Sequence, residues 1–319
     1  MDLSIIIVNW NSKDYLAKAI SSIFAATRSM SFEVLVIDSG SFDGCAEMLQ
    51  TTHPDVVFIQ SRHNLGFAAA NNAAFRAARG RIILFLNPDT EILGNAIEQL
   101  YSRLTGMPQA GIVGPKLLNS DGSVQDTCVR AFPTILNQFL DSDLLRTRFP
   151  QAALWGKQTL SVQTDLPMKV EAVSGACLMI KRSVFEAVGL FSTDYFMYAE
   201  DMDLCLKTSR AGFSAYYVPT AVVVHHGGAS SAQAPANTFS AVMALESQWR
   251  FFRKTRSWHY AALYRAAMFS AAVLRVSALA LAWPMRGLHN RNWRGAQALR
   301  KWMARLRWAL GGERWVRNY

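Results

Sequence analysis

Apolar and polar positions form two kinds of block along the first ninety residues. Short runs rich in β-branched and aromatic residues occupy positions 3–8, 32–37, 56–59 and 82–86, and each has the length of a strand. Segments with helical spacing of apolar residues lie at 15–24 and 68–78, and another begins after Gly44. Strands that alternate with helices predict an α/β fold with a mostly parallel, Rossmann-like sheet flanked by helices.

The pattern is less regular after residue 110. Further strands are predicted at 112–118, 177–180 and 221–224, and one at 124–127 that would form a hairpin around Asp121 and Gly122. A short helix is predicted at 183–188, and the segment 196–204 is predicted to enter a helix that runs to about residue 210 and is capped by Gly212. Residues 130–168 show no clean period, and we interpret them as a variable region.

The central apolar run ends abruptly in Asn87, Pro88 and Asp89. Because proline cannot continue a sheet ladder, the strand should stop there and place two polar side chains at its carboxyl end. Ligands of open α/β sheets bind at that edge. Such a tripeptide can hold a divalent cation, and the cation can hold a diphosphate. The alternative is an Asx turn that only caps the strand.

Other polar side chains also follow predicted strands or loops: Asn9, Asp38, Asn64, Glu200, Asp201 and His225. Each has a simpler explanation, since Asp38 could be a helix N-cap and the two acidic residues could favour the positive end of a helix. These separate explanations do not account for so many polar residues at one predicted edge of the sheet. The first strand-to-helix turn contains no glycine, which excludes a dinucleotide-binding fingerprint and a P-loop.

Seven segments occur in a recognisable order, at residues 5–11, 36–44, 64–72, 86–89, 174–176, 198–204 and 225–228. Together they resemble the motifs of family 2 of the nucleotide-sugar glycosyltransferases, which have the GT-A fold. The likeness is greatest to rhamnosyltransferase-like members, which build bacterial cell-surface polysaccharide. It covers residues 3–230 and is specific for the family, although it says little about the sugar.

The resemblance implies a nucleotide pocket built from the first half of the chain. Asp38 would accept a hydrogen bond from the imino N–H of uracil or thymine. Asn9, Asn64, Gly66 and Asn72 would line the nucleoside and phosphate pocket. The variable region at 130–168 would face the acceptor.

The resemblance also implies the reacting groups. Asp89 would ligate Mg²⁺ or Mn²⁺, and His225 would complete the metal or diphosphate site. Many family members have aspartate where this chain has Asn87, so we assign Asn87 to a ribose hydroxyl. Asp201 would be the catalytic base, with Glu200 orienting donor or acceptor. An inverting transfer needs these parts, a base for the attacking hydroxyl and a cation for the leaving diphosphate.

Charge is distributed unevenly along the chain. Residues 250–319 contain fifteen Lys or Arg and one acidic residue, a net charge of +14, whereas residues 1–249 contain eighteen and twenty-two, a net charge of −4. This argues against a body that binds nucleic acid and favours a tail that contacts an anionic surface. The longest uncharged run there, residues 276–285, is shorter than the roughly 20 residues that span a bilayer.

Residues 293–310 predict a basic amphipathic helix, the pattern of an element that lies in a membrane interface. The alternative is an arm that packs on the body. The stripe on this helix consists of Leu299, Trp302, Met303, Leu306 and Leu310.

The four cysteines are far apart and lack metal-site spacing, so we expect reduced, mostly buried thiols. Met1 leads almost directly into the first strand, which leaves no room for a signal peptide, and we expect a cytoplasmic protein that is peripheral at the inner face of the cell membrane.

The sequence therefore predicts a GT-A catalytic domain at residues 1–245 and a helical, membrane-interface extension at 246–319. The expected activity is inverting, metal-assisted transfer of L-rhamnose from dTDP-L-rhamnose to a lipid-linked or growing glycan. A UDP-sugar transferase for galactose, glucose or an N-acetylhexosamine is the alternative within this class. A non-catalytic carbohydrate-binding protein is the alternative outside it.

Overall fold

The computed structural model describes residues 1–227, 238–287 and 294–319 of the chain, so the predictions for Gly228 and Trp293 lie outside the described residues. The chain divides into two compact units. Unit 1 comprises Met1–Phe132, Phe149–Phe196 and Glu200–Ser230, and unit 2 comprises Pro133–Arg148, Met197–Ala199 and Ser231–Tyr319. Residues 133–148 thus group with the C-terminal helices, which no pattern in the sequence indicated.

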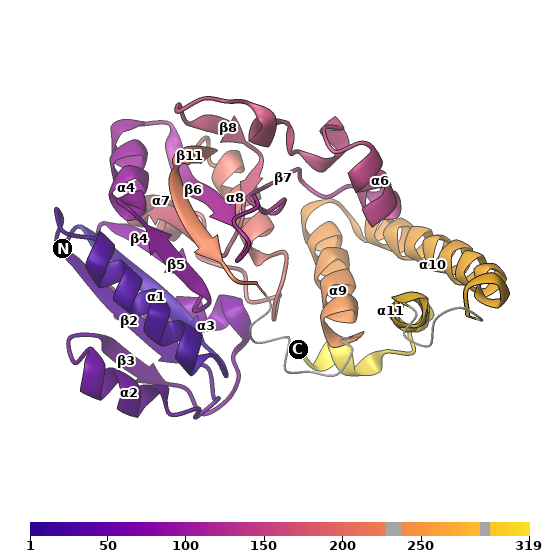
Figure 1. Ribbon diagram of the computed structural model, residues 1–319, viewed down its shortest axis with the longest axis horizontal. Helices are drawn as coiled ribbons and strands as arrows, with labels where there is room; N and C mark the ends of the chain where they lie inside the picture. The colour runs from indigo at the N-terminus through magenta and orange to yellow at the C-terminus, as the bar shows by residue number, and fades with distance from the viewer. Residues whose placement is uncertain (228–237, 288–293) are drawn as a thin grey trace. The chain divides into compact units, whose positions relative to one another are not determined.

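A nine-stranded sheet organises the described part of unit 1, with strand order β3-β2-β1-β4-β10-β6-β11-β5 and with β8 paired to β11 (Figure 1). Strands β1, β2, β3 and β4 are parallel neighbours, β10 runs antiparallel between β4 and β6, and β11 runs parallel to β6. The strands are β1 (Leu3–Asn9), β2 (Phe32–Asp38), β3 (Val57–Gln60), β4 (Ile82–Leu86), β5 (Thr90–Leu93), β6 (Ala110–Leu118), β8 (Met168–Val170), β10 (Cys177–Lys181) and β11 (Ser214–His225), and a small second sheet pairs β7 (Val129–Arg130) with β9 (Ala172–Val173).

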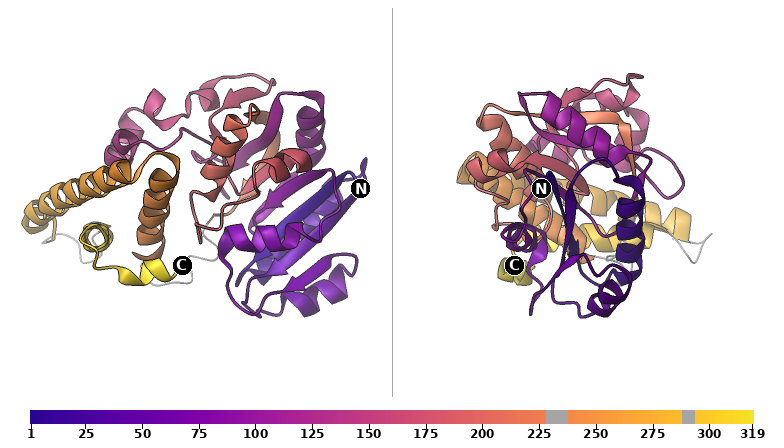
Figure 2. Two further views of the ribbon diagram at one scale, coloured as in Figure 1. Left: turned by 180° about the vertical axis from the view of Figure 1, so that it is seen from behind. Right: turned by 90° about the vertical axis from the view of Figure 1, so that its left-hand side faces the viewer.

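Helices cover both faces of this sheet, as the two views in Figures 1 and 2 show for α1 and α3. Apolar side chains of α1 (Lys13–Ala26), α2 (Cys45–Thr52) and α4 (Ala96–Gly106) join one face of the strands in a single buried core. On the other face, α3 (Gly66–Phe75) and α7 (Arg182–Ala187) pack through aromatic rings. Phe85 of β4 lies 5.0 Å from Phe185 and 4.7 Å from Phe191, measured between ring centroids.

The structure confirms the α/β fold and the first four strands, each within one residue of the predicted bounds. Two predictions about strands were wrong. Residues 124–127 form no strand, because Val124 makes only an isolated bridge to Leu118. Strand β11 begins at Ser214 rather than near 221, and a register shift between Val218 and Val222 accommodates Pro219 within the strand.

Strand β5 was not predicted. It follows Asp89 directly and pairs antiparallel with β11, so that Thr90 lies opposite His225. The Asn-Pro-Asp tripeptide therefore stops one strand and immediately opens another.

Three long helices form unit 2: α9 (Thr238–Thr255), α10 (Trp258–Gly287) and α11 (Arg294–Ala309), with the short helices α5 (Ile135–Phe139), α6 (Asp143–Arg148) and η3 (Arg314–Asn318). Their shared interior contains the buried side chains of Phe252, Tyr264 and Trp308. Glu246 is also buried there, and its carboxylate accepts from the indole N–H of Trp308 at 2.9 Å and from Arg250 at 3.3 Å. These bonds satisfy a charge that would otherwise be costly to bury.

Helix α10 is much longer than the uncharged run at 276–285, because Arg265 and Arg275 interrupt the apolar run without interrupting the helix. Within the described residues, Trp258–Leu281 is long and apolar enough to cross a bilayer, judged by length and composition alone.

The buried hydrogen bond between Glu246 and Trp308 should contribute to the free energy of unfolding. Glu246→Gln keeps an oxygen that can accept from the indole N–H, whereas Glu246→Leu leaves that donor buried without a partner. We expect Glu246→Leu to lose about 1–3 kcal/mol of unfolding free energy relative to Glu246→Gln. Chemical denaturation followed by tryptophan fluorescence measures the difference. Equal midpoints for the two variants would contradict the assignment.

Candidate active site

The ends of β1 and β2 bring Asn9 and Asp38 together, because these residues are partners in the parallel register. Asn9 donates to Asp38 Oδ1 at 3.0 Å, and the backbone N–H groups of Ser41 and Phe42 donate to Oδ2 at 3.1 and 2.9 Å. Gln60 adds a bond of 2.7 Å to Oδ2, and the Ser41 hydroxyl donates to Oδ1. Burial alone would raise the pKa of Asp38, but these bonds outweigh it and hold the pKa below its ordinary value. Asp38 is thus a buried carboxylate that organises the turn after β2.

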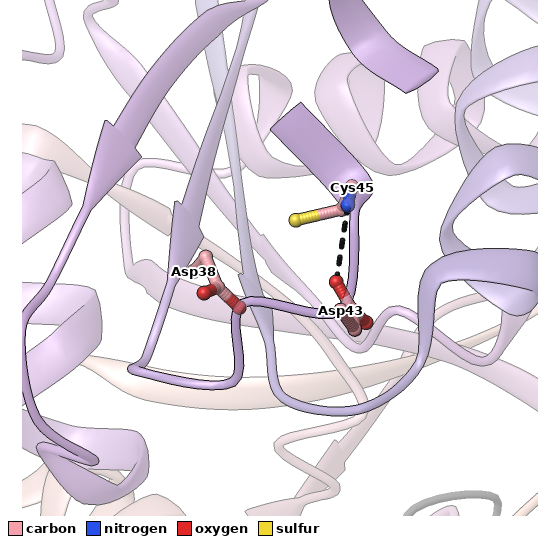
Figure 3. A group of neighbouring side chains, drawn as sticks. All are labelled: Asp38, Asp43 and Cys45. Carbon is pink, nitrogen blue, oxygen red and sulfur yellow. Dashed lines mark hydrogen bonds between the residues drawn. The ribbon is translucent and has the colours of Figure 1, made fainter. Parts of the chain in front are cut away.

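Asp43 and Cys45 lie close to Asp38, and one ligand atom from each of the three falls within 4.8 Å of the others (Figure 3). By distance this group could hold a metal ion. Asp43 already accepts from the backbone N–H groups of Ser12 and Lys13 at 2.9 and 3.0 Å, which caps the start of α1, and from Cys45 N–H at 3.1 Å. Burial strongly raises the pKa of the Cys45 thiol. A protonated thiol and a carboxylate that caps a helix suit a structural role.

The segment after β3 is held by its own side chains. The exposed Asn64 accepts from Gly66 N–H at 2.9 Å, an Asx turn that opens α3. Gly66 has a φ of +71°, and a Cβ there would collide with the carbonyl oxygen of Phe196. Asn72 donates to Phe191 O at 2.8 Å and accepts from Phe191 N–H at 3.1 Å. Its amide therefore ties α3 to the segment before α8 (Glu200–Arg210).

A second polar group forms where β4 and β11 end. His225 Nε2 lies 3.4 Å from Asp89 Oδ1 and 3.3 Å from Asn87 Nδ2. Gln125 holds the other side of the ring, because its amide N–H donates to the carbonyl of His225 at 2.6 Å and its oxygen lies 2.9 Å from Nδ1. That orientation, assigned from the hydrogen bonds, makes Nδ1 the protonated nitrogen and turns the lone pair of Nε2 toward Asp89.

This arrangement fits a divalent cation. A carboxylate oxygen and an unprotonated imidazole nitrogen face each other across a short gap, and the side chains are only 9% and 16% exposed. The carboxylate suits Mg²⁺ or Mn²⁺, whereas the imidazole ligand favours a transition metal such as Mn²⁺ over Mg²⁺, and a second residue that fixes the histidine tautomer is typical of metal-binding histidines.

The acidic pair lies at the start of α8. Asp201 accepts from Gly175 N–H at 3.0 Å and from Met202 N–H at 2.8 Å, one bond to each oxygen. Oε2 of the buried Glu200 has no hydrogen-bond partner among the described residues. Burial, and then the charge of Asp201, raise the pKa of Glu200 to about 8, against a smaller opposing effect of Arg130. At neutral pH Glu200 is therefore largely protonated, and it lies beside Asp201, whose two oxygens each accept a backbone N–H.

The start of β10 joins these two groups. Asn87 N–H donates to Ala176 O at 2.9 Å, and the adjacent Gly175 N–H donates to Asp201. The Asn87–Asp89–His225 group and the Glu200–Asp201 pair consequently share one edge of the sheet. Just before α8, Tyr198 and Ala199 both have positive φ, 70° and 67°. Such strained backbone is concentrated at functional sites.

Residues 4–189 match the sequence profile of glycosyl transferase family 2, and residues 145–317 match that of glycosyl transferase family group 2. This chain is a family 2 glycosyltransferase. It is 30% identical to the N-acetylglucosaminyl-diphospho-decaprenol L-rhamnosyltransferase of Mycobacterium tuberculosis over 253 residues, which are 75% of this chain and 80% of that protein. The rhamnosyltransferase WbbL of Escherichia coli is 26% identical over 271 residues, 82% of this chain and 90% of that one.

Among solved structures, the mannosyltransferase PcManGT of Pyrobaculum calidifontis, determined with GDP-Man and Mn²⁺, superposes with a TM-score of 0.57 at 18% identity. It covers 97% of this chain, which in turn covers 86% of that one. At this identity the likeness concerns the fold. The predicted family, the GT-A fold and the identification as an enzyme are confirmed.

Sequence reasoning missed three residues of the glycosyltransferase site. Gln125 and Gly175 act through the amide and backbone N–H groups that hold His225 and Asp201. Gln60 bonds Asp38 from the neighbouring strand. The motif around Gly175 was visible in the sequence, but nothing there indicated which carboxylate it would hold. Gln125 lay inside the strand predicted at 124–127 and carried no signal of its own.

The raised pKa of Glu200 predicts how stability changes with pH. The stability that protonated Glu200 contributes is fully present below its ordinary pKa of 4.5 and is lost as the pH rises towards about 8. Relative to Glu200→Gln, the wild-type protein should therefore lose melting temperature between pH 5 and pH 8. Thermal unfolding across this range tests it. Glu47→Gln, at an exposed position, is the control for the loss of one carboxylate as such.

Proposed function

We propose that this enzyme is an inverting transferase that moves L-rhamnose from dTDP-L-rhamnose to a lipid-linked glycan acceptor in bacterial surface polysaccharide synthesis. The observation that carries the proposal is the shared edge, on which a site for a cation and an acidic pair are joined through Gly175 and Ala176. The names of the relatives from M. tuberculosis and E. coli support rhamnose, and the first of them supports an acceptor on a polyprenyl diphosphate.

Asp201 is the base in this proposal. Both of its oxygens are anchored by backbone N–H groups, so the carboxylate is held in one orientation and keeps lone pairs for the proton of an attacking hydroxyl. Glu200 is protonated beside it and can donate a hydrogen bond to donor or acceptor. Two neighbouring carboxyl groups in different environments can thus serve at one pH as a proton acceptor and as a hydrogen-bond donor.

Asp89 and His225 would hold the divalent cation, with Asn87 placed to reach a ribose hydroxyl or the same cation. A bound Mg²⁺ or Mn²⁺ supplies positive charge where the leaving diphosphate gathers negative charge. Gln125 keeps His225 in the tautomer that can bind a metal.

The turns after β1, β2 and β3 would form the nucleoside side of the pocket. Asn9 and Asp38 would shape the part of the pocket at the ends of β1 and β2. Asn64 and Gly66 would set the path of the chain after β3. Because both oxygens of Asp38 already accept several bonds, a pyrimidine imino N–H would reach Asp38 only by displacing Ser41 or Gln60. We therefore assign Asp38 mainly to shaping the pocket, and Asn72 to holding α3 in place.

The donor and the base are tested together. Among dTDP-L-rhamnose, UDP-galactose, UDP-glucose, UDP-N-acetylglucosamine and GDP-mannose, we expect transfer to a polyprenyl-diphosphate acceptor only from dTDP-L-rhamnose. Asp201→Asn should lower kcat by about 10²–10⁴-fold with little change in nucleotide affinity. A UDP-sugar as preferred donor would replace the rhamnose assignment. An active Asp201→Asn alongside an inactive Glu200→Gln would reverse the two roles.

The proposed cation site can be tested by removing the metal ion and by replacing His225 or its neighbour His226. We expect chelator to abolish transfer and Mn²⁺ or Mg²⁺ to restore it, and His225→Ala to weaken Mn²⁺ binding by about 10–100-fold. His226→Ala is the matched control, because that ring bonds Glu91 at 2.9 Å and Ser120 at 2.8 Å instead. Isothermal titration with Mn²⁺ and nucleotide gives the affinities. Full activity in excess chelator would contradict the metal site.

A further inference from the structure

Helix α10 has one face that packs within unit 2 and one that does not. The packed face contains the buried side chains of Ala261, Tyr264, Met268, Ala271 and Ala272, which lie against α9 and α11. These positions recur every three or four residues, as expected for one side of a helix.

Arg265 and Arg275 of α10 belong to the packed side. The Arg265 guanidinium lies over the Trp308 ring at 4.7 Å and near the Trp249 ring at 5.5 Å. Arg275 donates to the carbonyl oxygens of Phe139 and Asp141 at 3.0 and 3.2 Å. The two charges that interrupt the apolar run in the sequence are therefore turned inward.

The outward face of α10 is consequently uncharged. Between Trp258 and Leu281, every exposed residue is something other than Lys, Arg, Asp or Glu. The face includes Trp258, Leu263, Phe269, Val273, Leu274 and Leu281, and the three leucines are 59%, 62% and 79% exposed. A stretch of 24 residues is about 36 Å long. Soluble proteins rarely expose an apolar patch of that extent unless it binds something.

The charge around this face indicates what binds it. Residues 250–319 carry a net charge of +14. Arg253, Lys254 and Arg256 are exposed immediately before α10 begins. A second copy of the chain would bring equal positive charge against this surface, whereas an anionic bilayer is complementary to it. Trp258 at the start of the helix suits the headgroup region, where tryptophan is enriched.

We propose that the outward face of α10 lies in the interfacial layer of an anionic bilayer, with the helix parallel to the surface. Spanning is disfavoured, because the opposite face packs on α9 and α11 and carries Arg265 and Arg275. The proposal thereby assigns the main membrane surface to α10 and not to the stripe expected on α11. In that stripe, Trp302 lies under the guanidinium groups of Arg275 and Arg305 at 4.5 and 4.3 Å, whereas Met303 and Leu310 are 37% and 69% exposed.

The inference rests on the proposed function only in that a lipid-linked acceptor gives the contact its purpose. Bound along this face, the enzyme would meet its acceptor by diffusion in two dimensions. The binding itself requires no donor, acceptor or metal ion.

The test is the double variant Leu263→Glu/Leu274→Glu of the full chain. Its matched control is Val162→Glu/Leu166→Glu, which adds the same charge at residues of unit 1 that are 52% and 66% exposed. The probe is co-sedimentation with vesicles of phosphatidylglycerol and phosphatidylcholine. We expect wild type and control to bind and the α10 variant to bind about tenfold to a hundredfold more weakly. Circular dichroism should show all three folded.

Several outcomes would overturn the proposal. They are equal binding by the two double variants, absence of wild-type binding to anionic vesicles, and resistance of the bound protein to carbonate extraction, which would mean that α10 spans. A wild-type dimer that the α10 variant dissociates, with vesicle binding unchanged, would assign the face to a second copy. Release of nucleotide from dTDP-L-rhamnose is measured separately on the same proteins. Its absence together with intact vesicle binding would refute the proposed function and leave the membrane face standing.

Discussion

The antiparallel course of β10 is the constraint on which the site depends. Because β10 enters the sheet beside the end of β4, its first residues lie next to Asn87, and the bond from Asn87 N–H to Ala176 O fixes that contact. The N–H of the preceding residue, Gly175, holds Asp201. A Cβ on Gly175 would lie only 3.2 Å from that of Asp201, so the two segments approach tightly at this point. A parallel strand here would place the same residues at the opposite edge of the sheet.

Hydrogen bonding gives two buried carboxyl groups of this glycosyltransferase pKa values that are shifted in opposite directions. Asp38 and Glu200 are both buried, yet Asp38 has its pKa lowered because protein donors occupy both oxygens. Glu200 has one oxygen without a partner and an acidic neighbour, and its pKa rises to about 8. The first arrangement suits a rigid element of a binding pocket. The second suits a group that can give or take a proton near neutral pH.

In unit 2, buried partners likewise accommodate charged groups, here the guanidinium groups of two arginines. Tryptophan rings and backbone carbonyl groups accommodate Arg265 and Arg275 on the packed side of α10, so that two charges are removed from its outer surface. The buried Glu246 receives the indole N–H of Trp308 in the same interior. An apolar outer face thus coexists with a strongly basic composition, which is the combination that we assign to a membrane interface.

The alternation of strands and helices, the family and the edge on which the polar residues gather could all be predicted from the residues alone. Those features depend on local periodicity and on motifs that stay close together in the chain, such as the run that ends at Asp89. The hydrogen-bond partners of the polar groups became known only from the three-dimensional arrangement of the chain. Asn72 proved to bind the backbone of Phe191 and Gln125 to orient His225, over separations of 119 and 100 residues. The same arrangement turns Arg265 and Arg275 inward. Hydrogen-bond geometry and the facing of a helix depend on how distant segments pack, and no local pattern of residues records that.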